Sequence, residues 1–439
     1  FCFCLGGAGL RAGWFGSGFL MASLYCGVDF GTTNSTIGVV GPDGAPVLIP
    51  VEGDAVTLPS ALFFSFEDQS THFGRSAVHE YMDGAEGRFM RALKSVLGTA
   101  LMEETTQIGR ERIGFEGLIG RFLSHLRDRL TAHTGAMPEH VVLGRPVYFV
   151  DGDQGADRTA QNQLEAAARS VGFSHVEFQF EPVAAALHFE RTLEAEALAL
   201  VVDIGGGTSD FSVLKLSPQR RASTDRRRDI LSTTGVHVGG TDFDRQLNIF
   251  KVMPEMGLGT LTRDGKREMP RWYFHDMATW HRINQLYRPE ILRDMRELQR
   301  EAAEPDKLER FRHLLAHRSG HRLAGQVEAA KIALTDTPMV AITLEEPGLS
   351  LAIPTTRAEF EAASAGLTGK IGAALDDALA AAGVSASAIE TVILTGGGAQ
   401  VRQVRALVDA RFAHARIAQS DRFGAVGLGL AVDAARRFA

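Results

Sequence analysis

Cysteine is scarce in this chain of 439 residues. The three cysteines, Cys2, Cys4 and Cys26, all lie near the N-terminus, so neither a disulfide framework nor a cysteine metal site can organise the fold. This distribution fits a reducing, cytoplasmic setting. An excess of positive charge is also missing, because the formal net charge is −7. We therefore expect no nucleic-acid partner, since phosphate backbones need concentrated Lys and Arg. The one arginine-rich stretch, 220–228, is interpreted as a solvated loop.

Long, uninterrupted apolar runs are absent as well. No purely apolar stretch reaches the roughly 18 residues that a membrane span needs, so we expect no membrane partner. Residues 1–20 are apolar and glycine-rich, but Arg11 interrupts them and no basic region precedes them. We interpret 1–20 as a non-native N-terminal extension upstream of a start at Met21. The alternative is a membrane anchor.

The length of the chain predicts two lobes, because a single hydrophobic core usually stops growing well below 439 residues. Short runs of β-branched and apolar residues alternate with helical patterns, which is typical of α/β proteins with mixed sheets. The predicted strands are 24–30, 61–66, 140–149, 197–203, 211–216 and 391–395.

A helical region interrupts this alternation. Between about 251 and 330 the strand patterns vanish and stretches rich in Glu, Arg and Leu appear, which predicts a helical subdomain inserted in the second lobe. Further on, Thr356 has Glu359 three residues after it. This is the pattern of a capping box and predicts the start of another helix.

Two segments repeat one pattern far apart in the chain. Residues 29–40 (DFGTTNSTIGVV) and 203–214 (DIGGGTSDFSVL) align without a gap. Each reads as a strand, an aspartate, a turn rich in Gly and Thr, and a second strand. Two such hairpins predict a duplicated domain.

Both turns have the chemistry of a phosphate site. The first follows Asp29 and contains Gly31, Thr32 and Thr33. The second follows Asp203 and contains Gly205, Gly206, Gly207 and Thr208. In each, glycine allows close approach of the backbone, and N–H groups and hydroxyls surround a concavity that suits phosphate oxygens. Facing each other, the turns would hold a triphosphate between the lobes. The alternative for either one alone is an ordinary tight turn.

The two aspartates, Asp29 and Asp203, would repel a polyphosphate directly. We therefore expect a divalent cation between them and the phosphates, namely Mg²⁺ with several of its waters retained. A third glycine cluster, Gly396, Gly397 and Gly398, lies between the predicted strand 391–395 and a helical pattern over 401–410. This order suits a base or ribose lying against bare backbone, and the alternative is a plain strand-to-helix turn.

Six motifs resemble, in order, the ATPase motifs of DnaK-type chaperones, the heat shock protein 70 family. They are GVDFGTTNS at 27–35, FEPVAAALHF at 180–189, VVDIGGGTSDF at 201–211, VHVGGTDFD at 236–244, VEAAKIALT at 327–335 and VILTGGGAQV at 392–401. The chain is most similar to the shortened, YegD-like members. The resemblance implies an actin-like ATPase fold with duplicated ribonuclease-H-like domains. Lobe I is expected at 21–197 and 418–439, and lobe II at 198–417.

The resemblance also implies roles for individual residues. Asp29 and Asp203 would hold the hydrated Mg²⁺, and Glu181 would act through water on the metal or on the attacking water. Lys94 would reach the γ-phosphate and the attacking water. Thr208 would complete the second clamp and belong to the catalytic residues. The implied nucleotide-binding residues are Gly31, Thr32, Thr33, Asn34, Gly205, Gly206, Gly207, Asp210, Gly239, Gly240, Glu328, Lys331, Thr335, Gly396, Gly397, Gly398 and Asp421. The implied cofactors are ATP or ADP and Mg²⁺, with K⁺ as a further candidate. Pro146 would relay the nucleotide state between the lobes.

Three of these assignments have alternatives. Lys94 also fits an ordinary solvated helix lysine. Glu328 and Lys331 stand three apart on a predicted helix, as in a surface ion pair. Glu181, which opens a helix before Pro182, also fits simple compensation of the helix dipole.

Two departures from the family pattern change the expectations. In better-known members two arginines sandwich the adenine, whereas the matching positions here are Ile332 and Gln400. We predict weaker or less base-selective binding, with apolar contact from Ile332 remaining. After Asp421 the sequence encodes one helix. We therefore expect no peptide-binding β domain, no lid and no client binding by the usual groove.

The leading hypothesis is a slow, ATP-hydrolysing nucleotide switch in a chaperone role, which presents a surface to a co-chaperone or client protein. The alternative is a bacterial actin-like, filament-forming ATPase, and a third class is a sugar or acid kinase on the same fold. TLPSALFF at 57–64, RALKSVLG at 91–98 and TRAEFE at 356–361 favour the chaperone type.

Overall fold

The computed structural model describes residues 24–108, 110–150, 152–190, 193–419 and 424–439. The expected extension 1–20 and Asp421 lie outside the described residues. Within this part of the chain, no helix is long and apolar enough to cross a bilayer.

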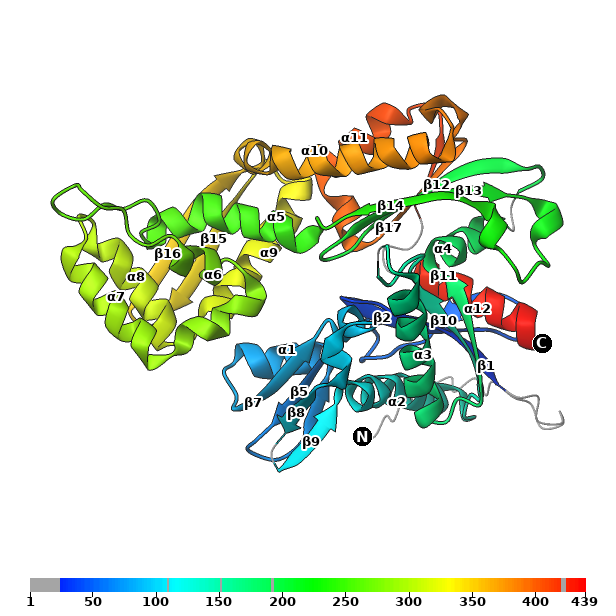
Figure 1. The fold of residues 1–439 in the computed structure, drawn as a ribbon. Helices are drawn as coiled ribbons and strands as arrows, with labels where there is room; N and C mark the ends of the chain where they lie inside the picture. Colours follow the sequence, from blue (N-terminus) through cyan, green and yellow to red (C-terminus); the bar gives the residue numbers. More distant parts are fainter. Residues whose placement is uncertain (1–23, 109, 151, 191–192, 420–423) are drawn as a thin grey trace, which may run out of the picture.

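Two sheets with the same strand order form the centre of the molecule (Figure 1). In the first sheet, β1 (Tyr25–Phe30) pairs with β2 (Asn34–Val40) in antiparallel fashion and with β10 (His140–Arg145) in parallel. The outer strands of this sheet are β11 (His175–Phe180), β3 (Pro46–Leu48) and the short β4 (Leu58–Pro59).

The second sheet repeats these directions. Its strand β12 (Ala197–Ile204) pairs antiparallel with β13 (Ser209–Leu216) and parallel with β17 (Thr391–Thr395). Its outer strands are β14 (Ile230–Val236) and β18 (Arg416–Gln419). Asp29 lies opposite Thr36 in the first hairpin, and Asp203 lies opposite Asp210 in the second. These pairs occupy equivalent places in the gapless alignment, so the predicted duplication is confirmed in the register of the strands.

Two helices connect the sheets. These helices, α4 (Glu181–Glu190) and α12 (Ala425–Phe438), pack closely enough that a Cβ on Gly429 would lie 1.8 Å from the backbone oxygen of Ala184. Buried side chains around them come from both sheets, for example Val142 and Ile393. The outer helices are α2 (Phe115–Thr134) and α3 (Gln154–Ser170) on the first sheet, and α10 (Arg357–Ala382) and α11 (Arg402–Arg411) on the second (Figure 1).

Each sheet carries a smaller subdomain. On the first, α1 (Gly74–Met82) packs on a three-stranded sheet, and β8 (Thr105–Ile108) pairs with β9 (Glu111–Gly114). The three strands are β5 (Ala61–Ser65), β6 (Thr71–Phe73) and β7 (Gly87–Arg91). On the second, the helices are α6 (Trp272–Met277), α7 (Pro289–Glu301), α8 (Pro305–Ala316) and α9 (Gly320–Asp336). The hairpin β15 (Met339–Glu346) and β16 (Leu349–Thr356) completes this subdomain.

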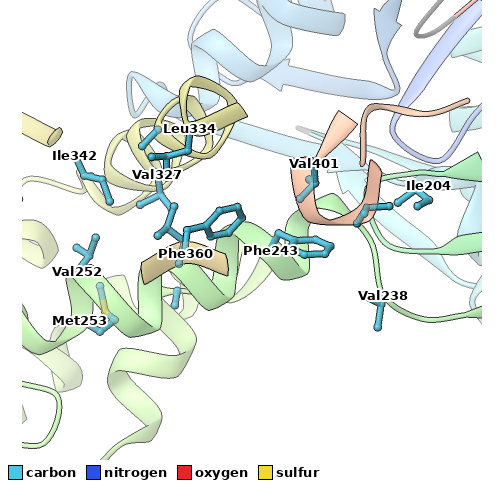
Figure 2. Packing of buried hydrophobic residues seen from close by; sticks show 14 of the residues in the cluster. Ile204, Val238, Phe243, Val252, Met253, Val327, Leu334, Ile342, Phe360 and Val401 are labelled. Atoms are coloured by element: carbon cyan, nitrogen blue, oxygen red, sulfur yellow. The ribbon is translucent and has the colours of Figure 1, made fainter. Parts of the chain in front are cut away.

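One continuous core joins the second sheet to its helical subdomain. Phe243 of α5 (Gly240–Leu247) packs near Phe360 of α10, with the ring centroids 6.2 Å apart. Figure 2 shows this row of buried side chains running from Ile204 at the end of β12 towards Val252 and Ile342. The helices that face the cleft therefore share one hydrophobic core with the strand that carries Asp203.

Two details correct the expectations from sequence, and one confirms them. The predicted strand 140–149 ends at Arg145, because Pro146 has no N–H to donate to a neighbouring strand. The stretch 220–228 is not simply solvated, since the fully buried Arg226 pairs with Glu190 and Asp229. Thr356 and Glu359 form the expected capping box at the start of α10.

Candidate functional site

A cavity of about 1000 Å³ lies between the two halves of the molecule. The carboxyl ends of parallel strands open onto it, as expected for a binding crevice in an α/β sheet. On one side lie Asp29 at the end of β1, Pro146 after β10, and Glu181 after β11. On the other lie Asp203 of β12 and Gly396 after β17.

The two glycine turns face each other across this cavity and touch. A Cβ on Gly206 would lie 2.5 Å from the hydroxyl oxygen of Thr33, so a side chain at 206 would require the Thr33 side chain to move. Gly31 is confined within its own turn, where an added Cβ would lie 2.1 Å from the backbone oxygen of Asn34. The predicted arrangement of two opposed turns is therefore present in the fold.

Neighbouring segments occupy carbonyl groups of both turns. In the first, Ser60 donates its hydroxyl to the Gly31 oxygen at 2.6 Å and its N–H to the Thr33 oxygen at 2.8 Å. In the second, Gly240 donates to the Gly205 oxygen at 2.9 Å, and Thr241 N–H to the Gly206 oxygen at 2.8 Å. These bonds orient the turns through their carbonyl groups. The Gly205 N–H is also used, because it donates to the Thr208 oxygen at 2.9 Å, and an anion would bind to the other N–H groups of the turns.

Two buried aspartates lie beside the turns. Burial, and next the charge of Glu181, raises the Asp29 pKa to about 7, although Lys94 opposes this shift. Burial, followed by the charges of Asp210 and Glu181, raises the Asp203 pKa to about 8. The site thus concentrates more negative charge than its lysine neutralises, which is the electrostatic setting for a bound cation.

Lys94 and Glu181 form a buried ion pair in the same cavity. The Lys94 ammonium donates to Oε1 of Glu181, and the lysine side chain is 8% exposed. Burial works against the charge of Lys94, but the carboxylates of Glu181, Asp29 and Asp203 outweigh burial and raise its pKa. The solvated-lysine alternative is therefore wrong. Lys94 lies on the short helical turn Leu93–Val96, which begins after Ala92 in a left-handed conformation with φ of 56°.

The donor set fits a hydrated cation better than a directly coordinated one. Among the described residues, no three acidic, His or Cys side chains lie close enough to hold a metal ion. Asp29, Asp203 and Glu181 nevertheless all line the cavity. Mg²⁺ usually keeps several waters and takes only one or two carboxylates, so these three residues suit a water-mediated Mg²⁺ site.

The helix α9 and the third glycine turn form the far wall of the cavity. Lys331 pairs with Asp244 of α5, with Nζ and Oδ1 2.8 Å apart, and lies 3.3 Å from the Gly240 oxygen. The alternative of a surface ion pair between Lys331 and Glu328 is therefore wrong, because Lys331 forms a bridge between two helices instead. Gly396 has φ of 79°, and a Cβ there would lie 2.2 Å from the Ile204 oxygen. The third glycine turn therefore packs closely against the end of β12.

The structure brings almost all the predicted residues together. The cavity lining includes Asp29, Gly31, Thr32, Thr33, Asn34, Lys94, Glu181, Asp203, Gly205, Gly206, Gly207, Thr208, Asp210, Gly240, Glu328, Lys331, Thr335, Gly396, Gly397 and Gly398. Gly239 is the exception among described residues. It supports the second turn from behind, because a Cβ there would lie 2.5 Å from the backbone of Gly206 and Gly207.

Sequence reasoning missed several lining residues, including Tyr148, Phe149, Thr241 and Asp244. Tyr148 and Phe149 belong to the loop that follows Pro146. This loop is braced by Asp157, which pairs with Arg145 at 2.8 Å and accepts the Phe149 N–H at 2.6 Å. Their position after a parallel strand was the available signal.

Comparison with known proteins agrees with this arrangement. The family model described as Hsp70 protein matches residues 25–254 and 308–436. The DnaK chaperone protein of Mycoplasmopsis pulmonis is 24% identical over 385 residues, covering 87% of this chain and 53% of the relative. That of Trichormus variabilis is 26% identical over 407 residues, covering 87% and 50%. The chain thus spans about half the length of these curated relatives. With most of its length matched by one family model, it belongs to the Hsp70 family and has the actin-like ATPase fold of that family.

Proposed function

We propose that this chain is a nucleotide switch, which binds ATP and ADP with Mg²⁺ in the cleft and slowly hydrolyses ATP in a chaperone-related role. The observation that carries the proposal is the meeting of two glycine turns around Asp29, Asp203 and the Lys94–Glu181 pair. Family membership supports the same conclusion.

In this proposal, different residues of the cleft bind the phosphates and the metal ion. The N–H groups of the two turns, with Thr33 and Thr208, bind the phosphate oxygens. Asp29, Asp203 and Glu181 hold the water shell of Mg²⁺, which when bound neutralises phosphate charge. Most of the catalysis is therefore positioning and electrostatic stabilisation.

The pair of Lys94 and Glu181 orients the reacting groups. Glu181 accepts from Lys94 with Oε1, which leaves Oε2 to orient a water molecule. Lys94 places its charge next to the transferred phosphoryl group. Because Glu181 anchors the lysine, the ammonium is held in place before the nucleotide arrives.

The output of the switch is proposed to be a change in lobe arrangement. Residues 21–197 with 418–439 and residues 198–417 would act as the two lobes, and the nucleotide contacts both turns at once. A ligand that binds the closed arrangement better than the open one shifts the population towards it. Another protein would bind the surface that results from this change.

Calorimetric titration of ATP and ADP with Mg²⁺ tests the proposal. We expect nanomolar to micromolar binding, on the order of 8 to 12 kcal/mol. Asp29→Asn should weaken Mg²⁺-dependent binding, whereas Asp128→Asn, whose side chain is 63% exposed, should not. Absence of binding in the wild type would refute the proposal. The family match does not favour the filament alternative, and ordered filaments with ATP in electron micrographs would revive it.

A further inference from the structure

The cavity continues past the phosphate turns into a slot formed by α9 and the third glycine turn. From α9 the slot is lined by Glu328, Ile332 and Thr335, and from the facing turn by Gly397 and Gln400. If the proposed function holds and the phosphates lie at the turns, the base of the nucleotide has to lie in this slot. The inference below rests on that function.

One face of α9 is dedicated to the slot. The helix buries Val327, Ala330 and Leu334 in the core, and two of these are labelled in Figure 2. The opposite face carries Ile332, whose side chain is 59% exposed although it is large and apolar. An exposed isoleucine inside a cavity gains free energy when a flat apolar surface covers it. A purine ring is such a surface, whichever substituents it carries.

Among the described residues, none of those named for the slot has an arginine or aromatic side chain that could stack on a base. No arginine occurs among the described residues that line the cavity. Lys331 is committed to Asp244 and to the Gly240 oxygen. Two aromatic lining residues, Tyr148 and Phe149, belong to the loop after β10 on the opposite half of the molecule. The imidazole of His237 lines the cavity directly after β14, away from α9 and the third glycine turn in the chain. Binding of the base therefore depends on the apolar surface area that it buries and on its hydrogen bonds.

The hydrogen-bonding groups of the slot accept either purine. Adenine offers a donor at its 6-amino group, whereas guanine offers an acceptor at O6 and a donor at its 2-amino group. The Gln400 amide, to which the described part of the chain offers no hydrogen bond, carries both a donor and an acceptor. The Thr335 hydroxyl does too. Glu328 and Asp336 are acceptors, and each purine has an amino group to donate.

We propose that this slot, with Ile332 on one side and Gln400 on the other, accepts guanine as readily as adenine, so that GTP occupies the site alongside ATP. Selectivity between such ligands needs a fixed donor or acceptor that the wrong base leaves unpaired. Among the described residues of the slot, Gln400 and Thr335 can each present either a donor or an acceptor, so neither of them fixes such an element. Affinity comes mainly from the triphosphate and Mg²⁺, which the two nucleotides share.

The test is calorimetric titration of ATP and GTP, each with Mg²⁺, into the full chain. We expect the two dissociation constants to agree within about tenfold. A preference for ATP larger than tenfold would overturn the inference and leave the proposed function intact. Failure of both nucleotides to bind would instead refute the nucleotide site itself.

Two variants sharpen the result. Ile332→Ala should weaken both nucleotides by the same factor, about three- to tenfold, because it removes apolar area alone. Leu261→Ala truncates a similarly exposed side chain outside the cavity and should change neither affinity. Gln400→Leu should leave the ATP to GTP ratio within tenfold. A larger change in that ratio would mean that the amide selects the base, which would contradict the inference.

Discussion

The turns at 31–34 and 205–208 share their register, length and leading aspartate, but their surroundings differ. The first is held by one residue, Ser60, and lies beside the Lys94–Glu181 pair. The second is held by the backbone of Gly240 and Thr241, and its aspartate lies opposite Asp210, whereas Asp29 of the first lies opposite Thr36. Both halves therefore share the backbone that we propose binds phosphate, whereas the Lys94–Glu181 pair, which we propose acts in catalysis, lies beside the first turn.

Replacing Lys94 should have the largest effect on ATP turnover, because it removes the charged pair that distinguishes the first turn from the second. Lys94→Met removes the ammonium group that Asp29, Asp203 and Glu181 share, and with it a positive charge beside the proposed position of the reacting phosphate. We expect ATP turnover to fall by about 10² to 10³ fold, the range seen when one electrostatic contact of a transition state is lost. Single-turnover assays with a phosphate sensor measure it.

The control is the surface pair of Lys215 and Glu196, whose Nζ and Oε1 lie 2.7 Å apart with both side chains about half exposed. Lys215→Met changes the same residue type on β13 and should leave turnover unaltered. A Lys94→Met variant with turnover within threefold of the wild type would contradict a catalytic role for the first half.

The second prediction concerns how Asp29 and Asp203 affect the stability of the fold at different pH values. Both pKa values are raised in the folded chain, to about 7 for Asp29 and about 8 for Asp203. A carboxyl with a raised folded pKa contributes stability below its unfolded pKa, and that contribution is lost as the pH rises through the folded value. In metal-free buffer, the wild type should therefore lose stability between about pH 4 and pH 8.

Asparagine cannot ionise, so it should remove this loss. We expect Asp203→Asn to raise the free energy of unfolding by about 5 kcal/mol at pH 8 and by little near pH 4, with a smaller gain for Asp29→Asn. Urea denaturation with a chelator measures both. Equal effects at the two pH values would contradict the raised pKa values.

The backbone of both turns could be predicted from the sequence. The gapless match of 29–40 with 203–214 predicted both hairpins, and the capping box at Thr356 predicted the start of α10. These features are local, because turn and cap chemistry depends on residues a few positions apart. The strand predicted to reach Phe149 ended at Arg145, where Pro146 could have indicated the boundary.

The partners of charged groups were not predictable in the same way. Glu181 forms an ion pair with Lys94, which is 87 residues away in the sequence. Lys331 pairs with Asp244 of another helix and not with Glu328 of its own helix. Ser60, which holds the first turn, is a small polar residue with no motif of its own. Such contacts depend on how the chain packs in three dimensions, which sequence spacing does not encode.

Glycine substitutions should give the smallest effect and separate the two turns. Gly31→Ala forces a methyl group against backbone of its own turn, the Asn34 oxygen, which cannot move away. Gly206→Ala instead meets the hydroxyl of Thr33, a side chain that can rotate. We expect Gly31→Ala to destabilise the fold by about 1 to 3 kcal/mol and Gly206→Ala by less, measured by urea denaturation.

The contact between Gly206 and Thr33 can then be isolated with a double-mutant cycle. Thr33→Ala removes the hydroxyl that an alanine at position 206 would strike, so the second substitution should relieve the first. A coupling energy of about 0.5 to 1 kcal/mol in unfolding is expected, because the two residues touch across the cleft. Strict additivity would mean that the turns do not meet in solution, and that the closed arrangement of the cleft forms only when a ligand bridges them.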